Sequence, residues 1–507
     1  MAAPLRHPLT LLACGLMGVI YLPLLPAAAL LIAPVRQADS WLALLGDPQL
    51  PQALAATLIS TLIAVGGALL LALCVVAALW PSPRWQRLNT RLPLLLAIPH
   101  VAFATAALLL FAEGSWLYSL FPVIDRYGVG LGLTLAVKES AFLLWAIYGL
   151  LGEQRLANQV LVLRSQGYGR WQCLAWLVLP RLMPQLTLVL LATTAWTLSV
   201  VDVALILGPG NPPTLAVLAA QWLSQGDDLQ QAKGALAALL LLALLAILIL
   251  LARLLWRIWT RAIPDFSGHR QPRPLALPGT LTAGLLPLCG VLCVTVLALA
   301  ASGFVGVHRG WDDSLWLALL SSLLSLGLSL LWLEYGPTRH TRWLWLPLIL
   351  PALPLAAGQY QLALYGWFDG AWLTVLWGHL LWVVPWTLFV LQPAWQRLDE
   401  RQILIARTFG WSRGRIFWQV KCPLLLRALL SALAVGFSVS IAQYLPTLWL
   451  GGGRITTLTT ETVALSSGGL PGPLAAQALW LLLLPGFFFL AMALLLRAVG
   501  HLRQGLR

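Results

Sequence analysis

Charged residues are scarce in this chain of 507 residues. Asp, Glu, Lys and Arg make up 9% of the sequence, whereas a soluble globular domain has roughly 25%. Hydrophobic residues make up 60% of it. They form repeated apolar stretches of about 20 residues, which is long enough to cross a hydrocarbon core of about 30 Å. The scarcity of charge therefore excludes an ordinary soluble protein and predicts an all-α polytopic membrane protein.

Lysine is rarer still, since only Lys138, Lys233 and Lys421 occur. None of them lies in the GxxxxGK[ST] loop that holds ATP phosphates. We therefore expect no cofactor on this chain and no catalysis by it, and the energy for any transport would come from a partner or a gradient. The six cysteines form no CxxC pair and the seven histidines lack ligand spacing, so neither a disulfide nor a metal site is expected.

Twelve membrane spans are predicted, six on each side of an Arg- and Pro-rich cytoplasmic linker at residues 258–275. The first half is therefore residues 1–257 and the second is residues 276–507. The predicted spans are residues 10–33, 53–80, 92–113, 129–151, 181–207 and 231–256, then 276–301, 313–334, 343–364, 370–391, 425–448 and 475–497.

The net charge of +14 comes from basic residues that cluster in short segments between apolar runs. This placement favours a topology signal over nucleic-acid binding, because cytoplasmic loops of membrane proteins are enriched in Lys and Arg. Most of these residues fall in the two tails, the linker and alternate loops. The intervening loops contain only Arg36, Arg126, Arg309 and Arg454. The pattern predicts that both termini are cytoplasmic.

One basic segment occurs twice without a gap. Residues 163–180 read LRSQGYGRWQCLAWLVLP and residues 406–423 read ARTFGWSRGRIFWQVKCP, separated by 243 positions, as Gly167 is from Gly410. The residues retained are Arg164, Gly167, Arg170 and Pro180 in the first copy, and Arg407, Gly410, Arg413 and Pro423 in the second. The match continues to Leu215 and Leu458 and indicates an internal duplication with parallel halves.

Each copy is predicted to form a helix, a sharp turn at the glycine, a short helix and then a membrane helix. Glycine makes such a turn at little cost, and proline favours the first turn of a helix. Arginines near helix ends can simply contact lipid headgroups. That alternative explains the charge but not the constant spacing of Gly, Arg and Pro. We therefore expect a docking element for another protein at the cytoplasmic face.

This spacing resembles the EAA loop of the permeases of binding-protein-dependent ABC importers. The residues that carry the resemblance are Gly167, Leu177, Leu179 and Pro180, then Gly410, Val420, Cys422 and Pro423. The chain departs from the family at Glu-Ala-Ala itself, where it has Leu161-Val162-Leu163 and Leu404-Ile405-Ala406. Both halves resemble the family, and the chain looks most similar to the fused permeases of ferric iron and thiamine importers.

The resemblance implies a type I permease fold in the bacterial inner membrane, with coupling loops at residues 152–180 and 394–424. It implies docking of two copies of an ABC ATPase subunit, which would bind ATP and Mg²⁺. An external, periplasmic binding protein would deliver a small solute, which ATP-driven alternating access would move into the cytoplasm. The lipid bilayer surrounds the chain, and no nucleic acid is implied.

Other functions stay open. The main alternative is a 12-span secondary transporter of the major facilitator kind, although its loop between spans two and three is expected to carry Gly and Asp, and WPSPRWQRLNTR has neither. A membrane-embedded transferase would need paired carboxylates at helical spacing, and Asp227-Asp228 and Asp312-Asp313 are adjacent instead. A scaffold without transport activity is the third possibility.

Polar residues inside predicted spans are candidates for the translocation path, because charge at membrane depth is costly and often functional. These candidates are Lys138, Glu139, Asp202, Gln359 and Gln443. The alternatives are that Lys138 and Glu139 are satisfied within the bundle and that Asp202 lies near the outer interface. The two glutamines would then only join helices by hydrogen bonds.

Overall fold

The computed structural model describes residues 8–112, 114–118, 125–152, 154–263, 279–304, 309–468 and 470–504, and the regular structure within them is helical. The helices before the predicted linker are α1 Pro8–Tyr21, α2 Leu24–Ile32, α3 Ala38–Leu45, α4 Leu50–Leu79, α5 Pro83–Ala97, α6 His100–Phe111, α7 Val129–Leu150, α8 Gln154–Ser165, α9 Arg170–Cys173, α10 Leu179–Ser199, α11 Asp202–Leu207, α12 Leu215–Leu223 and α13 Asp228–Arg261. The helices after it are α14 Gly279–Ala301, α15 Trp311–Tyr335, α16 Leu346–Ile349, α17 Ala352–Gly366, α18 Trp372–Gln396, α19 Glu400–Thr408, α20 Arg413–Ile416, α21 Cys422–Ile441, α22 Leu445–Gly451, α23 Leu458–Ser466 and α24 Pro471–Gln504.

Ten helical segments of the described chain are long and apolar enough to cross a membrane. They are Pro8–Arg36, Leu50–Leu79, Val129–Leu150, Arg170–Ser199, Asp228–Arg261, Leu281–Ala301, Trp311–Tyr335, Trp372–Gln396, Arg413–Ile441 and Pro471–Gly500. The prediction of an all-α polytopic membrane protein is thus confirmed.

The third predicted span of each half is not one continuous helix. In the first half, α5 and α6 meet at Ile98-Pro99, and in the second half, α16 and α17 meet at Leu350-Pro351. Proline has no amide hydrogen and disfavours a helical conformation in the residue before it. Ile98 and Leu350 accordingly have extended ψ angles of 116° and 146°. Within the described residues, ten of the twelve predicted spans therefore contain a helical segment long enough to cross a membrane, and the third span of each half does not.

The fifth predicted span of each half is also interrupted. Helix α10 ends at Ser199 and α11 begins at Asp202, while α21 ends at Ile441 and α22 begins at Leu445. Val200 between α10 and α11 is extended, with ψ of 126°. Predicted spans 181–207 and 425–448 therefore each contain a long helix, a break and a short helix.

The internal duplication extends over more of the chain than the sequence match. The offset between Gly167 and Gly410 also separates the starts of α7 and α18, of α10 and α21, and of α13 and α24. A tertiary hydrogen bond is repeated as well. Leu215 N donates to Thr57 Oγ1 (2.9 Å) at the start of α12, and Leu458 N donates to Ser314 Oγ (2.7 Å) at the start of α23.

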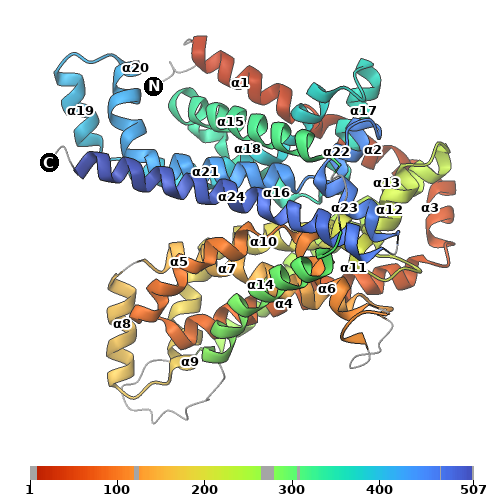
Figure 1. Cartoon of the computed structure of the whole chain (residues 1–507), viewed down its shortest axis with the longest axis horizontal. Helices are drawn as coiled ribbons and strands as arrows, with labels where there is room; N and C mark the ends of the chain where they lie inside the picture. Colours follow the sequence, from red (N-terminus) through yellow and green to blue (C-terminus); the bar gives the residue numbers. More distant parts are fainter. Residues whose placement is uncertain are drawn as a thin grey trace.

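The first helix of each half packs on the other half. Helix α1 packs against α15 and α18, where Thr10 Oγ1 donates to Tyr335 O (3.0 Å) and Tyr21 Oη donates to Leu344 O (2.8 Å). Helix α14 packs against α4 and α6 (Figure 1). Three long helices pack on one another within each half, α4, α7 and α10 in the first and α15, α18 and α21 in the second.

The division of the chain at residues 258–275 stays a prediction. Helix α13 continues to Arg261, so the first residues of the predicted linker are helical. Residues 264–275 of that linker lie outside the described residues.

Close packing of α4 on α7 depends on Gly132. A Cβ atom there would lie 2.9 Å from Ser60 O and 2.9 Å from Ile63 Cβ. We expect Gly132→Leu to lower the thermal unfolding temperature of the detergent-solubilised protein by several degrees, because overpacking costs about 1–3 kcal/mol or more. Gly149→Leu is the control, since Gly149 lies in the same helix with nothing within 4 Å of its Cβ position. Equal unfolding temperatures for the two variants would contradict this account of the packing.

Candidate coupling segments and transport path

The turn after α8 is built on the backbone of Gly167. Its φ of +94° lies in the left-handed region, which side chains other than glycine rarely adopt. Gly167 N donates to Arg164 O (3.0 Å) and Tyr168 N donates to Leu163 O (3.1 Å). These two bonds satisfy carbonyls at the end of α8, as in a Schellman helix terminus.

The turn after α19 repeats this geometry. Gly410 has φ of +73°, Gly410 N donates to Arg407 O (2.9 Å) and Trp411 N donates to Ala406 O (3.2 Å). Ser412 then caps the next helix by accepting from Arg415 N (3.3 Å). The predicted order of helix, glycine turn, short helix and membrane helix is confirmed in both copies.

Pro180 and Pro423 lie in the first turn of α10 and α21, as the sequence predicts, but these helices are not separate from the short helices before them. In each copy the short helix is continuous with the membrane helix through one π turn, Leu174–Val178 or Phe417–Lys421. The proline follows this turn by two residues. Because proline has no amide hydrogen, the carbonyl one turn earlier lacks its usual donor, and a widened turn accommodates this. The short helix and the membrane helix are therefore one mechanical element.

Both coupling segments lie at the same end of the molecule, where α24 also ends. Figure 1 shows α8 and α9 below and α19 and α20 above. Arg164, Arg407 and Arg413 are exposed to solvent at this end. Arg170 is also exposed, and its Nη1 donates to Ala78 O (2.8 Å) near the end of α4.

An apolar pair is exposed at the same position of α8 and α19. The exposed fractions are 51% for Leu161 and 55% for Val162, and 61% for Leu404 and 56% for Ile405. These residues stand where the resembling family has Glu-Ala-Ala. The two helices thus present apolar surface at the positions where the resembling family has an acidic residue.

Among the path candidates, Glu139 is paired. Its Oε1 lies 2.6 Å from His100 Nε2, and the His100 ring lies against Trp196 with a centroid distance of 4.3 Å. Glu139 is buried on α7, and His100 is the first residue of α6, directly after the proline break. The pair therefore fixes one side of the interrupted third span.

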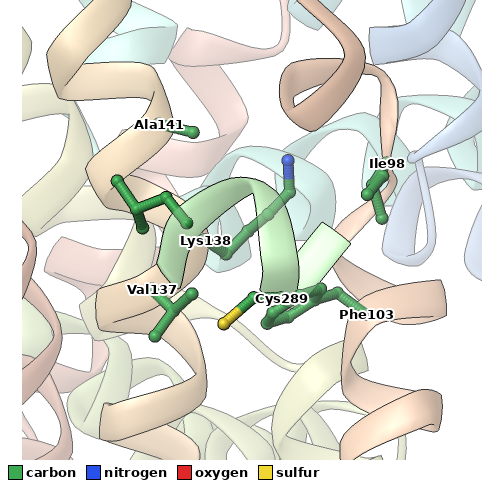
Figure 2. A pocket seen from close by; sticks show the side chains of 7 residues that line it. Ile98, Phe103, Val137, Lys138, Ala141 and Cys289 are labelled. Atoms are coloured by element: carbon green, nitrogen blue, oxygen red, sulfur yellow. The ribbon is translucent and has the colours of Figure 1, made fainter. Parts of the chain in front are cut away.

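Lys138 is buried on the same helix and lines a cavity between α6, α7 and α14 (Figure 2). The cavity walls are otherwise apolar or sulfur-bearing, including Phe103 and Cys289. It has room for no more than about one water molecule. In this conformation the cavity is too small to hold a solute.

Asp202 and Gln443 lie at the two equivalent helix breaks. Asp202 begins α11 and is half-buried, and it is close enough to His100 and to Tyr444 for electrostatic interaction. Gln443 lies between α21 and α22 and donates through Nε2 to Val439 O (3.0 Å). The structure thus brings Asp202 near the break that contains Gln443.

Gln359 is fully buried on α17 and is used to join helices. Its Nε2 donates to the carbonyl of Gly378 on α18 (2.9 Å). This bond is the helix-joining alternative that the sequence left open. It sets Gln359 apart from the residues at the helix breaks.

Sequence reasoning missed His379. This residue is buried on α18, with Nδ1 2.8 Å from Ser440 Oγ and Nε2 2.8 Å from Thr447 Oγ1. Ser440 is the last residue but one of α21 and Thr447 lies in α22, so His379 holds the two sides of the second break together. A polar residue in an apolar span was the available signal. Within the described residues, no group of three or more His, Cys, Asp or Glu side chains is placed to hold a metal ion.

Comparison with known proteins decides the family. The chain is 61% identical over 511 residues to the Escherichia coli (strain K12) inner membrane ABC transporter permease protein YnjC, and the match covers 100% of both chains. The chain belongs to the inner-membrane permeases of ABC transporters. The family described as "Binding-protein-dependent transport system inner membrane component" matches residues 294–502 of this permease.

More distant relatives match a shorter part of the permease. Homologs of the spermidine/putrescine transport system permease protein PotC from Mycoplasma genitalium and Mycoplasma pneumoniae are 30% identical over 95 residues. The matches cover 19% of this permease and 33% of each relative. The multi-pass inner-membrane assignment agrees with the apolar helices, and the family favours the ABC permease interpretation over the major facilitator alternative.

Proposed function

We propose that this permease is the membrane-spanning subunit of an ABC importer. It moves a small solute, delivered by an external periplasmic binding protein, into the cytoplasm by ATP-driven alternating access. The observation that carries the proposal is the repeated coupling segment. Two turns of the same geometry, at Gly167 and Gly410, lie at one end of the molecule. We call the surface of each coupling segment (residues 152–180 and 394–424) a socket, and two equivalent sockets suit two copies of one ATPase subunit.

Each socket combines apolar and basic surface. The exposed pairs Leu161-Val162 and Leu404-Ile405 would bury apolar area in the ATPase subunit, with a free energy of about 25 cal/mol per Å². Exposed Arg164 and Arg407 lie three residues later and would pair with carboxylates at the rim of the contact. This arrangement replaces the acidic contact of the family's Glu-Ala-Ala.

The solute path would run between the halves, near the helix breaks. Asp202, Gln443, Lys138 and Glu139 are its candidate residues. Interrupted membrane helices expose backbone groups that a ligand or water can use, and such breaks are tolerated where they line a cavity. The ends of the chain and both coupling segments would face the cytoplasm, as the distribution of basic residues predicts.

Co-purification tests the proposal directly. The permease is co-expressed with candidate ABC ATPase subunits, and the complex is isolated through a tag on the permease. We expect two ATPase subunits per permease and ATP hydrolysis that the cognate periplasmic binding protein stimulates. If the tagged permease retains no ATPase subunit, the importer proposal fails. Uptake that persists without ATPase but stops with a proton ionophore would favour a gradient-coupled carrier.

Charge reversal tests the basic part of the socket. We expect Arg164→Glu together with Arg407→Glu to lower the retained ATPase subunit several-fold at low salt, because rim charges act mainly on association and its salt dependence. The control is Arg36→Glu with Arg454→Glu, which changes the same net charge in the loops predicted to be external. Unchanged retention in the socket variant at low salt would show that the arginines do not contribute to docking.

A further inference from the structure

The end of the second coupling segment carries a buried ion pair. Lys421, the last residue of the π turn before α21, pairs through Nζ with Glu334 Oε2 on α15. The side chains are only 13% and 11% exposed. Lys421 Nζ also lies 4.8 Å from the ring centroid of Trp395 near the end of α18. One lysine thus joins the coupling segment to two membrane helices.

The first coupling segment is fastened to a membrane helix by a different bond and at a different position, since Arg170 is the counterpart of Arg413 and not of Lys421. Arg170 Nη1 donates to Ala78 O (2.8 Å). Ala78 is the last residue but one of α4, and Glu334 is the last residue but one of α15. Helices α4 and α15 are the two core helices whose other ends hold α12 and α23 through Thr57 and Ser314. Each coupling segment is therefore fixed to a helix that reaches the opposite end of the molecule.

We propose that these contacts are latches that transmit movement of the docked ATPase subunits to α15 and α4. Lys421, Glu334 and Arg170 are positioning residues in this role, and the proposal rests on the proposed function. The turn at Gly410 gives the segment freedom on its outer side, whereas the ion pair fixes its inner side. A displacement of α20 then moves α15 with it.

The two latches respond differently to substitution. The first uses a backbone carbonyl as acceptor, so no side-chain change in α4 removes it. The second needs two opposite charges, and removing one leaves the other buried without its counter-ion, which is strongly unfavourable. Coupling in the second half therefore depends on charge complementarity between α15 and the coupling segment.

The test uses the complete complex of permease and ATPase subunits. Hydrogen exchange of the peptides covering the start of α15, residues 311–322, is measured without nucleotide and with ATP and vanadate. We expect a nucleotide-dependent difference in wild type that falls at least about threefold in Lys421→Met and in Glu334→Gln, while the ATPase subunits stay bound. Lys421→Arg keeps the charge and is expected to retain the difference. The double variant Lys421→Glu with Glu334→Lys is expected to regain at least half of it.

Lys233 provides the matched control. It pairs with Asp47 and lies 4.1 Å from the Trp222 ring centroid, with side chains 8% and 13% exposed. Lys233→Met thus removes the same kind of pair from the opposite end of the molecule, and is expected to leave the nucleotide response unchanged. If Lys421 had a purely structural role, Lys421→Met and Lys233→Met would both be less stable, and their nucleotide-dependent hydrogen exchange would not differ.

The outcomes are distinct. A wild-type response that persists in Lys421→Met and Glu334→Gln overturns the latch, and so does a wild-type complex in which nucleotide leaves α15 unchanged. Loss of the ATPase subunits from Lys421→Met also overturns it, because the pair would then serve docking. If wild type retains no ATPase subunit, the proposed function itself fails.

Discussion

Valine in place of both Gly167 and Gly410 will reduce the ATPase subunit retained by the permease at least tenfold. These glycines have φ angles of +94° and +73°, and a β-branched residue is strained there by about 1–3 kcal/mol at each site. A Cβ atom at Gly410 would meet nothing within 4 Å, so the strain there comes from the backbone conformation and not from lack of space. We expect the chain to relieve this strain by abandoning the turn. Helices α8 and α19 then point in new directions, and both sockets lose their shape together.

The matched control is Gly114→Val with Gly453→Val. These glycines have φ of +77° and +74°, with nothing within 4 Å of the Cβ position. The strain is therefore of the same size, but neither residue lies in a coupling segment. Co-purification and size-exclusion chromatography measure both double variants. Equal retention of the ATPase subunit by the two would show that strain alone, and not the coupling turns, governs the result.

The coupling segments were predictable because their information is local. A left-handed turn selects glycine, so Gly167 and Gly410 mark the turns in the sequence. The π turns before Pro180 and Pro423 were not predicted, because the sequence indicated only that a helix begins near each proline. The repeated Thr-Leu marks the same place in each copy, since Thr214 and Thr457 each directly precede a short helix. Duplication made these local signals visible.

The helix breaks were less predictable. Pro99 and Pro351 lie within predicted spans and do mark the breaks there. The prolines indicated the breaks, but the high hydropathy of these stretches led to the prediction of continuous spans. The break at Val200 has no such signal, because valine is apolar and compatible with a membrane helix. Its conformation depends on tertiary packing, where Ser199 Oγ accepts from Ala352 N (3.0 Å) at the break of the other half.

Partners of the buried charges could not be predicted from one sequence. Glu139 pairs with His100 from another helix, and Lys421 pairs with Glu334, 87 positions away. The sequence offered only the general alternative that Lys138 and Glu139 are satisfied within the bundle, without naming His100 as the partner of Glu139. The packing of α1 on α15 of the other half is equally hard to predict, because the sequences of apolar helices carry little information about which neighbour they pack against.

Asp202→Asn is expected to lower binding-protein-dependent uptake at least tenfold while leaving ATPase retention unchanged. Asp202 is half-buried at the start of α11, and none of the ion pairs of the described residues includes it. A charge at membrane depth costs about 2.5–3.5 kcal/mol, which the electrostatic interaction with His100 offsets in part. Asparagine removes the charge and keeps the size of the side chain, so thermal stability should rise or stay equal.

That combination separates a functional carboxylate from a structural one. A structural Asp202 would lose stability on substitution, whereas a residue of the solute path loses transport and gains stability, as strained functional sites do. Uptake into vesicles is measured with the solute that the cognate binding protein carries. The unfolding temperature is measured on the same preparation. Asp312→Asn is the control, because Asp312 is an exposed acidic residue in the first turn of α15. Normal uptake by Asp202→Asn would remove this residue from the path and leave the break at Gln443 as the place to search.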